Sequence, residues 1–253
     1  MSKIIVVTSG KGGVGKTTCA VNLGAALNSL NENVLLVDAN LTTPNIGLHL
    51  GAPVVPISLN HVLLGKATIE DSIYEHSSGT KIIPSSLSIK ELKKINHSKL
   101  KYFGKKFKKY ADYVIFDCAA GLGSEALAAI ESADELVLVC NPEMPSVADA
   151  LKTLKVAEEF KKEIKGVIIT RYKGRKSEMS IKSIKEMLEV PVLGIIPEDK
   201  KVQEALAMKS PVFTAFPKSK SSRNFKIIAN RLIGKKSEIK RNFLDKFLEK
   251  VGF

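Results

Sequence analysis

The sequence is poor in the features that mark metal-cluster, membrane-spanning and secreted proteins. Its three cysteines, Cys19, Cys118 and Cys140, form no C-x-x-C pair, so we expect neither an iron–sulfur carrier nor a zinc site. No run of about 18 apolar residues occurs, so no segment is expected to span a membrane. The start of the chain is too short for a signal peptide before the first motif begins. We therefore expect an intracellular, reduced protein.

The composition fits one sizeable globular domain with a basic surface. The chain has 253 residues, 44% of them hydrophobic, and we predict a single α/β domain at residues 1–233. The formal net charge of +13 favours contact with polyanionic surfaces such as acidic lipid or nucleic acid. Cys118 and Cys140 lie in strand-like apolar runs, so buried packing is their expected role.

A glycine-rich segment near the start of the chain fits the phosphate-binding motif G-x-x-x-x-G-K-[ST]. A short apolar, β-branched run at residues 4–7 indicates a buried strand before it, and apolar residues at helical spacing follow it. Such a unit turns backbone N–H groups and the positive end of a helix toward an anion. The residues expected around the phosphates are Gly10, Lys11, Gly12, Gly13, Val14, Gly15, Lys16, Thr17 and Thr18.

The motif assigns separate roles to two of these side chains. Lys16 is expected on the β- and γ-phosphates of a nucleoside triphosphate, and the Thr17 hydroxyl on Mg²⁺. The N-K-x-D motif of GTPases is absent from the sequence, which favours ATP over GTP. A chance glycine-rich turn is the alternative, but the strand–loop–helix context argues against it.

Strand-like runs recur along the chain and are mostly separated by helix-like stretches, which predicts an α/β fold. We expect a doubly wound, mostly parallel sheet of about seven or eight strands flanked by helices, of the P-loop NTPase type. The predicted strands are residues 3–8, 33–38, 80–84, 112–117, 135–140, 166–170 and 191–196. Ligands of such sheets bind outside the carboxyl ends of the strands, so functional residues are expected just after each strand.

Two aspartates end predicted strands. Asp117 closes an apolar run at residues 113–116, which is the Walker B arrangement, so we expect it in the Mg²⁺ shell. Asp38 ends the second strand, where its carboxylate can reach the Mg²⁺ shell or the water that attacks the γ-phosphate. The alternative for Asp38 is capping of the turn that follows it.

A second lysine in the glycine-rich loop makes the resemblance to known proteins more specific. The run Lys-Gly-Gly-Val-Gly-Lys-Thr-Thr at residues 11–18 resembles the deviant Walker A signature of the MinD/ParA family of P-loop ATPases. The resemblance covers about residues 1–233 and is closest to MinD-like proteins. It implies that Lys11 reaches across an ATP-bound homodimer to the partner's phosphates, as an arginine finger does elsewhere. A solvated lysine on an exposed loop is the alternative.

The segments after Asp38 and Asp117 resemble the switch regions of this family but depart from them. Asn40 stands where the family has a second aspartate that helps to place the attacking water. Asparagine can orient water but cannot accept a proton, so we expect slow ATP hydrolysis. Ala119 replaces the proline of the family's D-x-P-A-G switch, in which Gly121 is expected to offer its N–H to the γ-phosphate.

The family resemblance also implies contacts at the dimer face. Glu143 lies in an N-P-E segment and is expected near the nucleotide of the partner subunit. Asp149, on the helix that follows, is expected to hold Lys11 in the monomer. Capping of the helix start is the alternative for both carboxylates.

Base recognition is expected at the ends of the last two strands. Thr170 and Arg171 occupy the place of an Asn-Arg pair that contacts adenine in the family, so Thr170 departs from the pattern. The backbone of the loop formed by Pro197, Glu198 and Asp199 resembles the segment that reads the adenine edge.

Nine lysines lie between residues 90 and 109, with Tyr102, Phe103 and Phe107 among them. We interpret this segment as an amphipathic helix with a solvated basic face. A surface for nonspecific DNA binding is the alternative.

Residues 234–253 form the second predicted unit, a basic linker followed by an amphipathic helix. Its apolar stripe recurs every three or four residues and is flanked by lysine and arginine; it consists of Ile239, Phe243, Leu244, Phe247, Leu248 and Val251. This pattern is typical of a helix in an acidic membrane interface, and MinD-like proteins carry a similar one. We expect residues 237–253 to attach a cytoplasmic protein to the inner face of the cell membrane. Packing on the domain or on a partner helix is the alternative.

The sequence thus predicts a MinD-like ATPase that needs ATP and Mg²⁺. Its ATP-dependent dimer would attach to the membrane, recruit an unidentified protein partner and position the division site or another polar structure. Two alternatives stay open, a ParA-like ATPase that binds DNA and a metabolic or metallocluster enzyme of the same fold.

Overall fold

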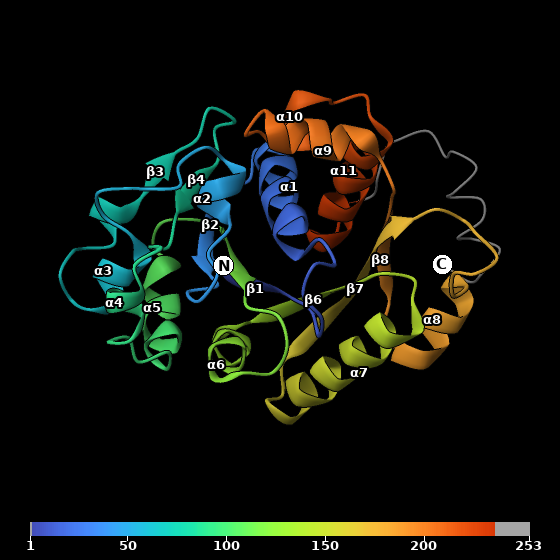
Figure 1. Cartoon of the computed structure of the whole chain (residues 1–253), viewed down its shortest axis with the longest axis horizontal. Coiled ribbons are helices and arrows are strands. Elements are labelled where there is room, and N and C mark those ends of the chain that lie inside the picture. The colour runs from blue at the N-terminus through green and yellow to red at the C-terminus, as the bar shows by residue number, and fades with distance from the viewer. Residues whose placement is uncertain (1, 236–253) are drawn as a thin grey trace.

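The computed structural model describes residues 2–235 and shows one twisted β-sheet with helices packed on both faces (Figure 1). Strands and helices alternate along the chain, so the predicted doubly wound α/β fold is confirmed. No helix within residues 2–235 is long and apolar enough to cross a membrane. The predicted tail helix at residues 237–253 lies outside the described residues.

The strands are β1 (Lys3–Thr8), β2 (Val34–Ala39), β3 (Tyr74–Glu75), β4 (Lys81–Ile83), β5 (Tyr113–Cys118), β6 (Glu135–Cys140), β7 (Glu163–Tyr172) and β8 (Val192–Pro197). The helices are α1 (Lys16–Asn28), α2 (Ile46–His49), α3 (Leu59–Leu63), α4 (Ile89–Leu92), α5 (Lys99–Phe107), α6 (Ser124–Ser132), α7 (Met144–Glu159), α8 (Ile181–Leu188), α9 (Lys200–Ala207), α10 (Val212–Ala215) and α11 (Lys220–Leu232), with a 3₁₀ turn at Glu70–Ser72.

The sheet of the described chain runs in the order β3-β4-β2-β5-β1-β6-β7-β8. All neighbouring strands are parallel except β3 and β4, which are antiparallel. The seven strands predicted from the sequence are all present. The sequence does not reveal β3, because Tyr74 and Glu75 form no apolar run. β1 is central and almost wholly buried, as a strand of a parallel sheet covered on both faces should be.

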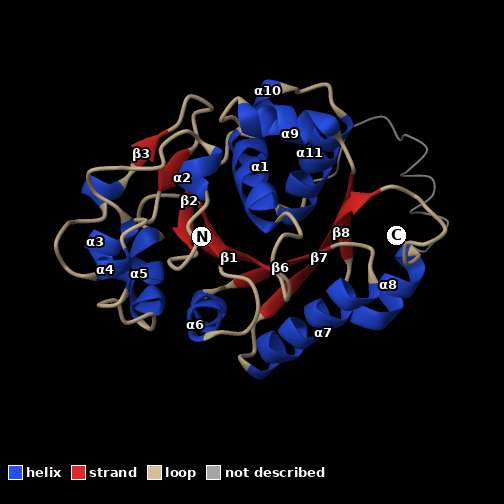
Figure 2. Cartoon of the chain, viewed as in Figure 1, coloured by secondary structure: helices blue, strands red, loops and turns tan. Residues whose placement is uncertain are grey.

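The two faces of the sheet carry different helices. On one face, Ile5 and Val7 pack with residues of α1 and α11, whereas Ile4 and Val6 face the core under α5 and α6. A third apolar cluster lies under α7 and α8. Figure 2 shows α1, α9, α10 and α11 together on one side of the sheet and α6, α7 and α8 on the other. The alternation along β1 therefore joins both cores through one strand.

The prediction of a single helix over the lysine-rich residues 90–109 is wrong. The structure has two short helices there, α4 and α5. Asn96 interrupts the segment, since its side-chain oxygen accepts from the Ser98 backbone N–H and from the Ser98 hydroxyl, a local bond that competes with helix. The exposed surface of α5 is rich in lysine, and Lys101 and the C-cap residue Lys108 pair with Glu131 and Asp134.

The last described helix, α11, ends at Leu232, and Lys235 then pairs with Glu32 at 2.9 Å. Helix α11 packs on α1 and β8, so the chain down to this point belongs to the core. The division into two units at residue 233 stays a prediction.

Candidate nucleotide-binding site

The sheet topology gathers the predicted site residues at one edge. β1 lies between β5 and β6, and β2 lies beyond β5. The loops after these four strands therefore meet at the carboxyl edge of the sheet, where ligands of parallel sheets bind. The register places Asp38 on β2 directly beside Asp117 on β5.

The glycine-rich loop has the backbone that the motif requires. Gly13 and Gly15 have φ values of +78° and +94°, in the left-handed region that favours glycine. Gly15 is the N-cap of α1, which begins at Lys16. The positive end of α1 therefore points at the loop, so the described geometry suits an anion at this position.

Lys16 and the two aspartates form a buried charge cluster beneath the loop. The Lys16 ammonium lies 3.0 Å from Asp117 Oδ1, and both side chains are nearly inaccessible to solvent. Because an ammonium group has three N–H donors, Lys16 can keep this bond and still donate toward the pocket that it lines. The structure therefore brings together three residues of the predicted site, and their expected roles toward a nucleotide and Mg²⁺ stay predictions.

The two buried carboxylates, Asp38 and Asp117, lie near a single lysine, Lys16. Burial raises the pKa of the Asp38 carboxyl well above its usual range, and the neighbouring Asp117 raises it further, although backbone N–H bonds and Lys16 act in the opposite direction. For Lys16, burial lowers the pKa, but the attraction of Asp117 and the other nearby anions outweighs burial and leaves the pKa raised. Lys16 is thus charged at neutral pH, and the cluster gains from any further cation.

The side-chain oxygens near the loop suit a Mg²⁺ ion that is also bound by the phosphates of a nucleotide. No group of three or more His, Cys, Asp or Glu side chains within residues 2–235 could hold a metal ion alone. Asp117 Oδ2 is buried and has no hydrogen-bond partner among residues 2–235. Thr17 lines the pocket into which Lys16 can donate. Mg²⁺ is commonly bound through one or two protein oxygens together with phosphate and water. Asp117 and Thr17 would hold it, with Asp38 beside them.

Asp38 caps the turn that follows β2, which is the role expected as the alternative to binding Mg²⁺. Its Oδ2 accepts from the backbone N–H groups of Asn45 and Ile46, each at 2.9 Å, at the start of α2. Its Oδ1 accepts from the Asn40 N–H at 3.3 Å. In this conformation the carboxylate holds the segment after β2, and its expected Mg²⁺ role stays a prediction.

Asn40 lines the pocket that is also lined by Gly12, Gly13, Lys16 and Thr17 of the loop, which we call the phosphate pocket. The Asn40 side chain is hydrogen-bonded to Thr43 within a turn. Its Nδ2 donates to the Thr43 carbonyl oxygen at 2.6 Å, and its Oδ1 accepts from the Thr43 backbone N–H and hydroxyl at 3.2 and 3.1 Å. Gly121, with φ of +82°, donates its N–H to the Ser9 carbonyl oxygen at 2.9 Å. A bond from Gly121 to a γ-phosphate therefore requires release of the bond to Ser9.

Lys11 is exposed in the glycine-rich loop, directly before Gly12 of the phosphate pocket, and forms no ion pair with another described residue. Its expected monomer partner, Asp149, pairs instead with Lys152 at 3.2 Å, because Lys152 is one helical turn away on α7. Glu143 is exposed at the N-cap of α7, and its side chain makes no capping bond. Capping is thus not the role of Glu143 here, and its proposed contact with a partner stays a prediction.

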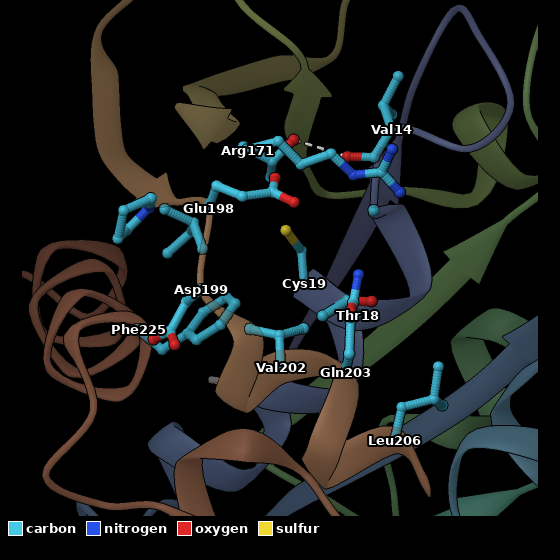
Figure 3. Close-up of a pocket in the computed structure, with 14 residues that line it drawn as sticks. Val14, Thr18, Cys19, Arg171, Glu198, Asp199, Val202, Gln203, Leu206 and Phe225 are labelled. Atoms are coloured by element: carbon cyan, nitrogen blue, oxygen red, sulfur yellow. Dashed lines mark hydrogen bonds between the residues drawn. The ribbon is translucent and has the colours of Figure 1, made fainter. Parts of the chain in front are cut away.

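A cavity of about 260 Å³ extends from the loop toward β7 and β8, and all five predicted base-binding residues line it. Figure 3 shows Arg171, Glu198 and Cys19 around it, with Val202 and Phe225 along its far wall. Arg171 lines both this cavity and the phosphate pocket, so the two are continuous at its side chain. The size and apolar wall suit a planar base.

Two of the predicted base-binding side chains are used within the protein. The Thr170 hydroxyl lies within hydrogen-bond distance of the carbonyl oxygens of Val14 and Cys140, at 2.6 and 3.2 Å, and its contact with Val14 holds the loop. The Asp199 carboxylate caps α9 through the Lys201 N–H and also accepts from Ser221 on α11. The expected contact of this loop with a base is through its backbone, which these side-chain bonds leave available.

The structure adds two residues that the sequence did not reveal. His49, at the end of α2, lines the phosphate pocket, and burial lowers its pKa. Glu125, on α6, is buried against the segment after β2. Neither residue belongs to a motif, and no spacing along the chain relates Glu125 to that segment.

Comparison with known proteins agrees with this site. Residues 5–212 match the family model described as the CobQ/CobB/MinD/ParA nucleotide binding domain. An uncharacterized ATP-binding protein of Methanocaldococcus jannaschii is 38% identical, and the match covers 98% of this chain and 96% of that protein.

Solved structures of MinD proteins share the fold. The septum site-determining protein MinD of Pyrococcus horikoshii, complexed with Mg-ADP, is 35% identical with a TM-score of 0.89, and the match covers 94% of this chain and all of that one. The MinC:MinD cell division protein complex of Aquifex aeolicus gives 30% identity and a TM-score of 0.84 over 95% of this chain and 99% of that one. The glycine-rich loop, the paired aspartates and these matches together show that the chain belongs to the MinD/ParA family of nucleotide-binding P-loop proteins.

Proposed function

We propose that the protein is a Mg²⁺-dependent ATPase that acts as a spatial switch. ATP binding would join two copies of the chain face to face, and the dimer would attach to an acidic membrane and recruit a protein partner. Hydrolysis would return it to monomers. The cycle would control where the protein acts, and no small-molecule product other than ADP and phosphate would leave the site.

The observation that carries this proposal is the state of Lys11. It is exposed beside the phosphate pocket and has no ion-pair partner among the described residues, whereas Lys16 in the same loop is buried on Asp117. One loop therefore presents one lysine inward and another outward. The outward ammonium is free to approach phosphates on a second subunit, which supports a role in trans.

Apolar side chains on the same edge of the sheet support a face-to-face dimer. Leu48, Leu122 and Met144 follow β2, β5 and β6, and they are 42%, 38% and 57% exposed. Large hydrophobic side chains gathered around a site are typical of surfaces that become buried against a partner. A second copy placed over this edge would cover them and would bring its own Lys11 to the opposite pocket.

Mg²⁺ and the chain would divide the chemistry at the phosphates. Thr17 and Asp117 would hold Mg²⁺, which would offset the charge of the β- and γ-phosphate oxygens. Lys16 would donate to the same oxygens, and the loop N–H groups would hold the phosphate chain in place. Asn40 would orient water only after release of its bonds with Thr43, and it could not accept the proton, so we expect hydrolysis to be slow.

Membrane attachment rests on residues 237–253, which lie outside the described residues. One amphipathic helix binds a membrane weakly, but two helices joined by a dimer bind much more strongly through effective concentration. ATP-dependent dimerisation would therefore control attachment. The unidentified protein partner and the division-site or other positioning role are parts of the same proposal.

The first test separates dimerisation from nucleotide binding. Light scattering on the wild type should show a dimer with Mg²⁺ and a non-hydrolysable ATP analogue, and a monomer with Mg-ADP. Lys11→Ala should bind both nucleotides yet stay monomeric. Lys105→Ala removes the same charge from the exposed surface of α5 and should behave as the wild type. A Lys11→Ala protein that dimerises normally would contradict the role in trans.

The second test concerns the membrane. The full chain should sediment with acidic liposomes in the ATP analogue but not in ADP, and a chain that ends at Gly234 should stay in the supernatant. Dimerisation without sedimentation would rule out membrane attachment. Salt-dependent binding of the same dimer to duplex DNA would then favour the ParA-like alternative.

A further inference from the structure

Glu125 is an acidic side chain buried at a loop to which no motif connects it. It lies in the first turn of α6 and is only 6% exposed. Its Oε1 accepts from the backbone N–H groups of Leu41 and Thr42, the second at 3.1 Å. Its Oε2 accepts from the Thr42 hydroxyl at 2.5 Å. Both oxygens of this buried carboxylate thus accept hydrogen bonds from residues that lie more than eighty positions earlier in the chain.

The helix that carries Glu125 is itself joined to the glycine-rich loop. Cys118 ends β5, and the short segment 119–123 leads directly into α6. Within that segment, the Gly121 N–H donates to the carbonyl oxygen of Ser9, the residue before Gly10. Any movement of Gly121 toward a phosphate would therefore be passed to the start of α6, and Glu125 is in the first turn of that helix.

The segment that Glu125 holds is also the segment that faces the phosphates. Residues 40–46 run from the Asn40 turn to the N–H groups held by Asp38. Asn40 and Thr43 line the phosphate pocket. Glu125 accepts from the two residues enclosed by the Asn40–Thr43 turn, whose backbone N–H groups are bonded by neither the Asn40 nor the Asp38 side chain.

We infer that Glu125 is a positioning residue that ties residues 40–46 to α6, so that this segment and the loop 119–123 respond to the bound nucleotide as one unit. The inference rests on the proposed ATPase in one respect only, namely that hydrolysis depends on the placement of residues 40–46. The coupling itself requires nucleotide binding but no hydrolysis.

The chemistry of the contact predicts which substitutions preserve it. In Glu125→Gln the amide oxygen can accept from Leu41 and Thr42, and the amide nitrogen can donate to the Thr42 hydroxyl, so the tie should survive. In Glu125→Ala the two N–H groups lose their acceptor, and the Leu41 backbone lies in a buried position. Glu131→Ala is the matched control, because Glu131 lies on the same helix but pairs with Lys101 at the surface.

Hydrogen exchange on the full chain tests the coupling without catalysis. Each protein is compared in Mg-ADP and in Mg²⁺ with a non-hydrolysable ATP analogue. In the wild type, Glu125→Gln and Glu131→Ala, the protection of residues 40–46 and 119–127 should change together between the two nucleotides. In Glu125→Ala, residues 119–127 should still respond, whereas the Leu41 and Thr42 amides should exchange roughly tenfold faster or more in both states.

Steady-state kinetics supply a second readout that a purely structural role would not give. Glu125→Ala should lower kcat about tenfold or more, while its Kd for Mg-ADP stays within about twofold of the wild type, because the loop and base cavity are intact. Glu125→Gln should restore most of kcat.

Two results would overturn the inference. One is a Glu125→Ala protein in which residues 40–46 keep their nucleotide-dependent protection. The other is a general rise of exchange over the whole chain, matched by equal losses of kcat and nucleotide affinity, because that would mark Glu125 as a stability residue only. A wild type that binds nucleotide but does not hydrolyse ATP would contradict the proposed function and would leave the exchange test of Glu125 intact.

Discussion

The approach of α7 to the glycine-rich loop depends on the absence of one side chain. A Cβ atom added to Gly10 would lie 2.1 Å from the Asp149 carbonyl oxygen and 2.3 Å from its carbonyl carbon. Both are backbone atoms in the interior of α7 and cannot rotate away. A Cβ atom added to Gly12, two residues later, would meet nothing within 4 Å. Gly10→Ala and Gly12→Ala therefore differ by contact alone.

The size of the effect follows from these distances. Real Cβ contacts are not shorter than 3.0 Å, so Gly10→Ala must separate the loop from α7 by about 1 Å, an overpacking change that typically costs about 1–3 kcal/mol and sometimes more. We expect a loss of about 3 kcal/mol in the free energy of unfolding, since neither element is flexible there. For a chain of this length that loss lowers Tm by roughly 6–12 °C. Gly12→Ala should be neutral or slightly stabilising, by about 0.5 kcal/mol, because its φ is not in the left-handed region.

Urea denaturation of both variants, without nucleotide, measures this difference. Fluorescence or circular dichroism would give the midpoint and the slope m for each, and equal slopes would show that stability alone has changed. Binding of Mg-ADP should also weaken in Gly10→Ala, since the loop is displaced. Equal unfolding midpoints for the two variants would refute the reasoning, because the close approach of Gly10 to Asp149 would then have no energetic consequence.

Three further predictions concern the charge cluster and its neighbours. The pKa of Asp38 is raised above its usual 3.8, so Asp38 destabilises the fold at neutral pH, and this penalty is relieved as the pH falls through the raised pKa toward 3.8. Asp38→Asn should therefore unfold at higher urea than the wild type at pH 7, with a gap that narrows in acid, and the opposite order at pH 7 would contradict the assignment. Lys16→Ala should lose the stabilisation by Mg-ADP, which in the wild type reaches about 2.7 kcal/mol at a ligand concentration of 100 times Kd and is measured by thermal shift. Asn40→Asp should hydrolyse ATP faster but unfold more easily, by about 1–3 kcal/mol, because a carboxylate oxygen would replace the amide that donates to Thr43 at 2.6 Å; a variant with unchanged turnover would show that Asn40 does not limit the rate.

Much of the fold could be predicted because its signals are local. Each of the seven predicted strands is a short apolar run, and a buried parallel strand needs little more than such a run. The glycine-rich loop is local as well, since Gly13 and Gly15 supply the positive φ values that the turn needs. The prediction of one helix for the lysine-rich segment is wrong because the Asn96 side chain accepts from the Ser98 backbone N–H, a local effect that apolar periodicity does not detect.

The roles of individual side chains at the site were harder to predict, because one residue type serves several purposes. Asp38 is predicted in the Mg²⁺ shell as a carboxylate that ends a strand, and the structure shows it bonded to backbone N–H groups at the start of α2. Thr170 is expected at the base, and it lines the base cavity while its hydroxyl donates to the Val14 carbonyl oxygen of the loop. A motif fixes where such a residue lies, whereas its neighbours fix which group it bonds.

The sequence by itself determined the class of the protein, namely a P-loop domain with an inward lysine, an outward lysine and two aspartates at the ends of strands. Each of these features depends on residues that are close together in the sequence, where spacing along the chain sets spacing in space. Only the tertiary structure decided the contacts that cross the sheet: Asp38 beside Asp117, Gly10 against Asp149, and Glu125 on Leu41 and Thr42. The order of strands brings these groups together, and that order is set by packing of the whole core.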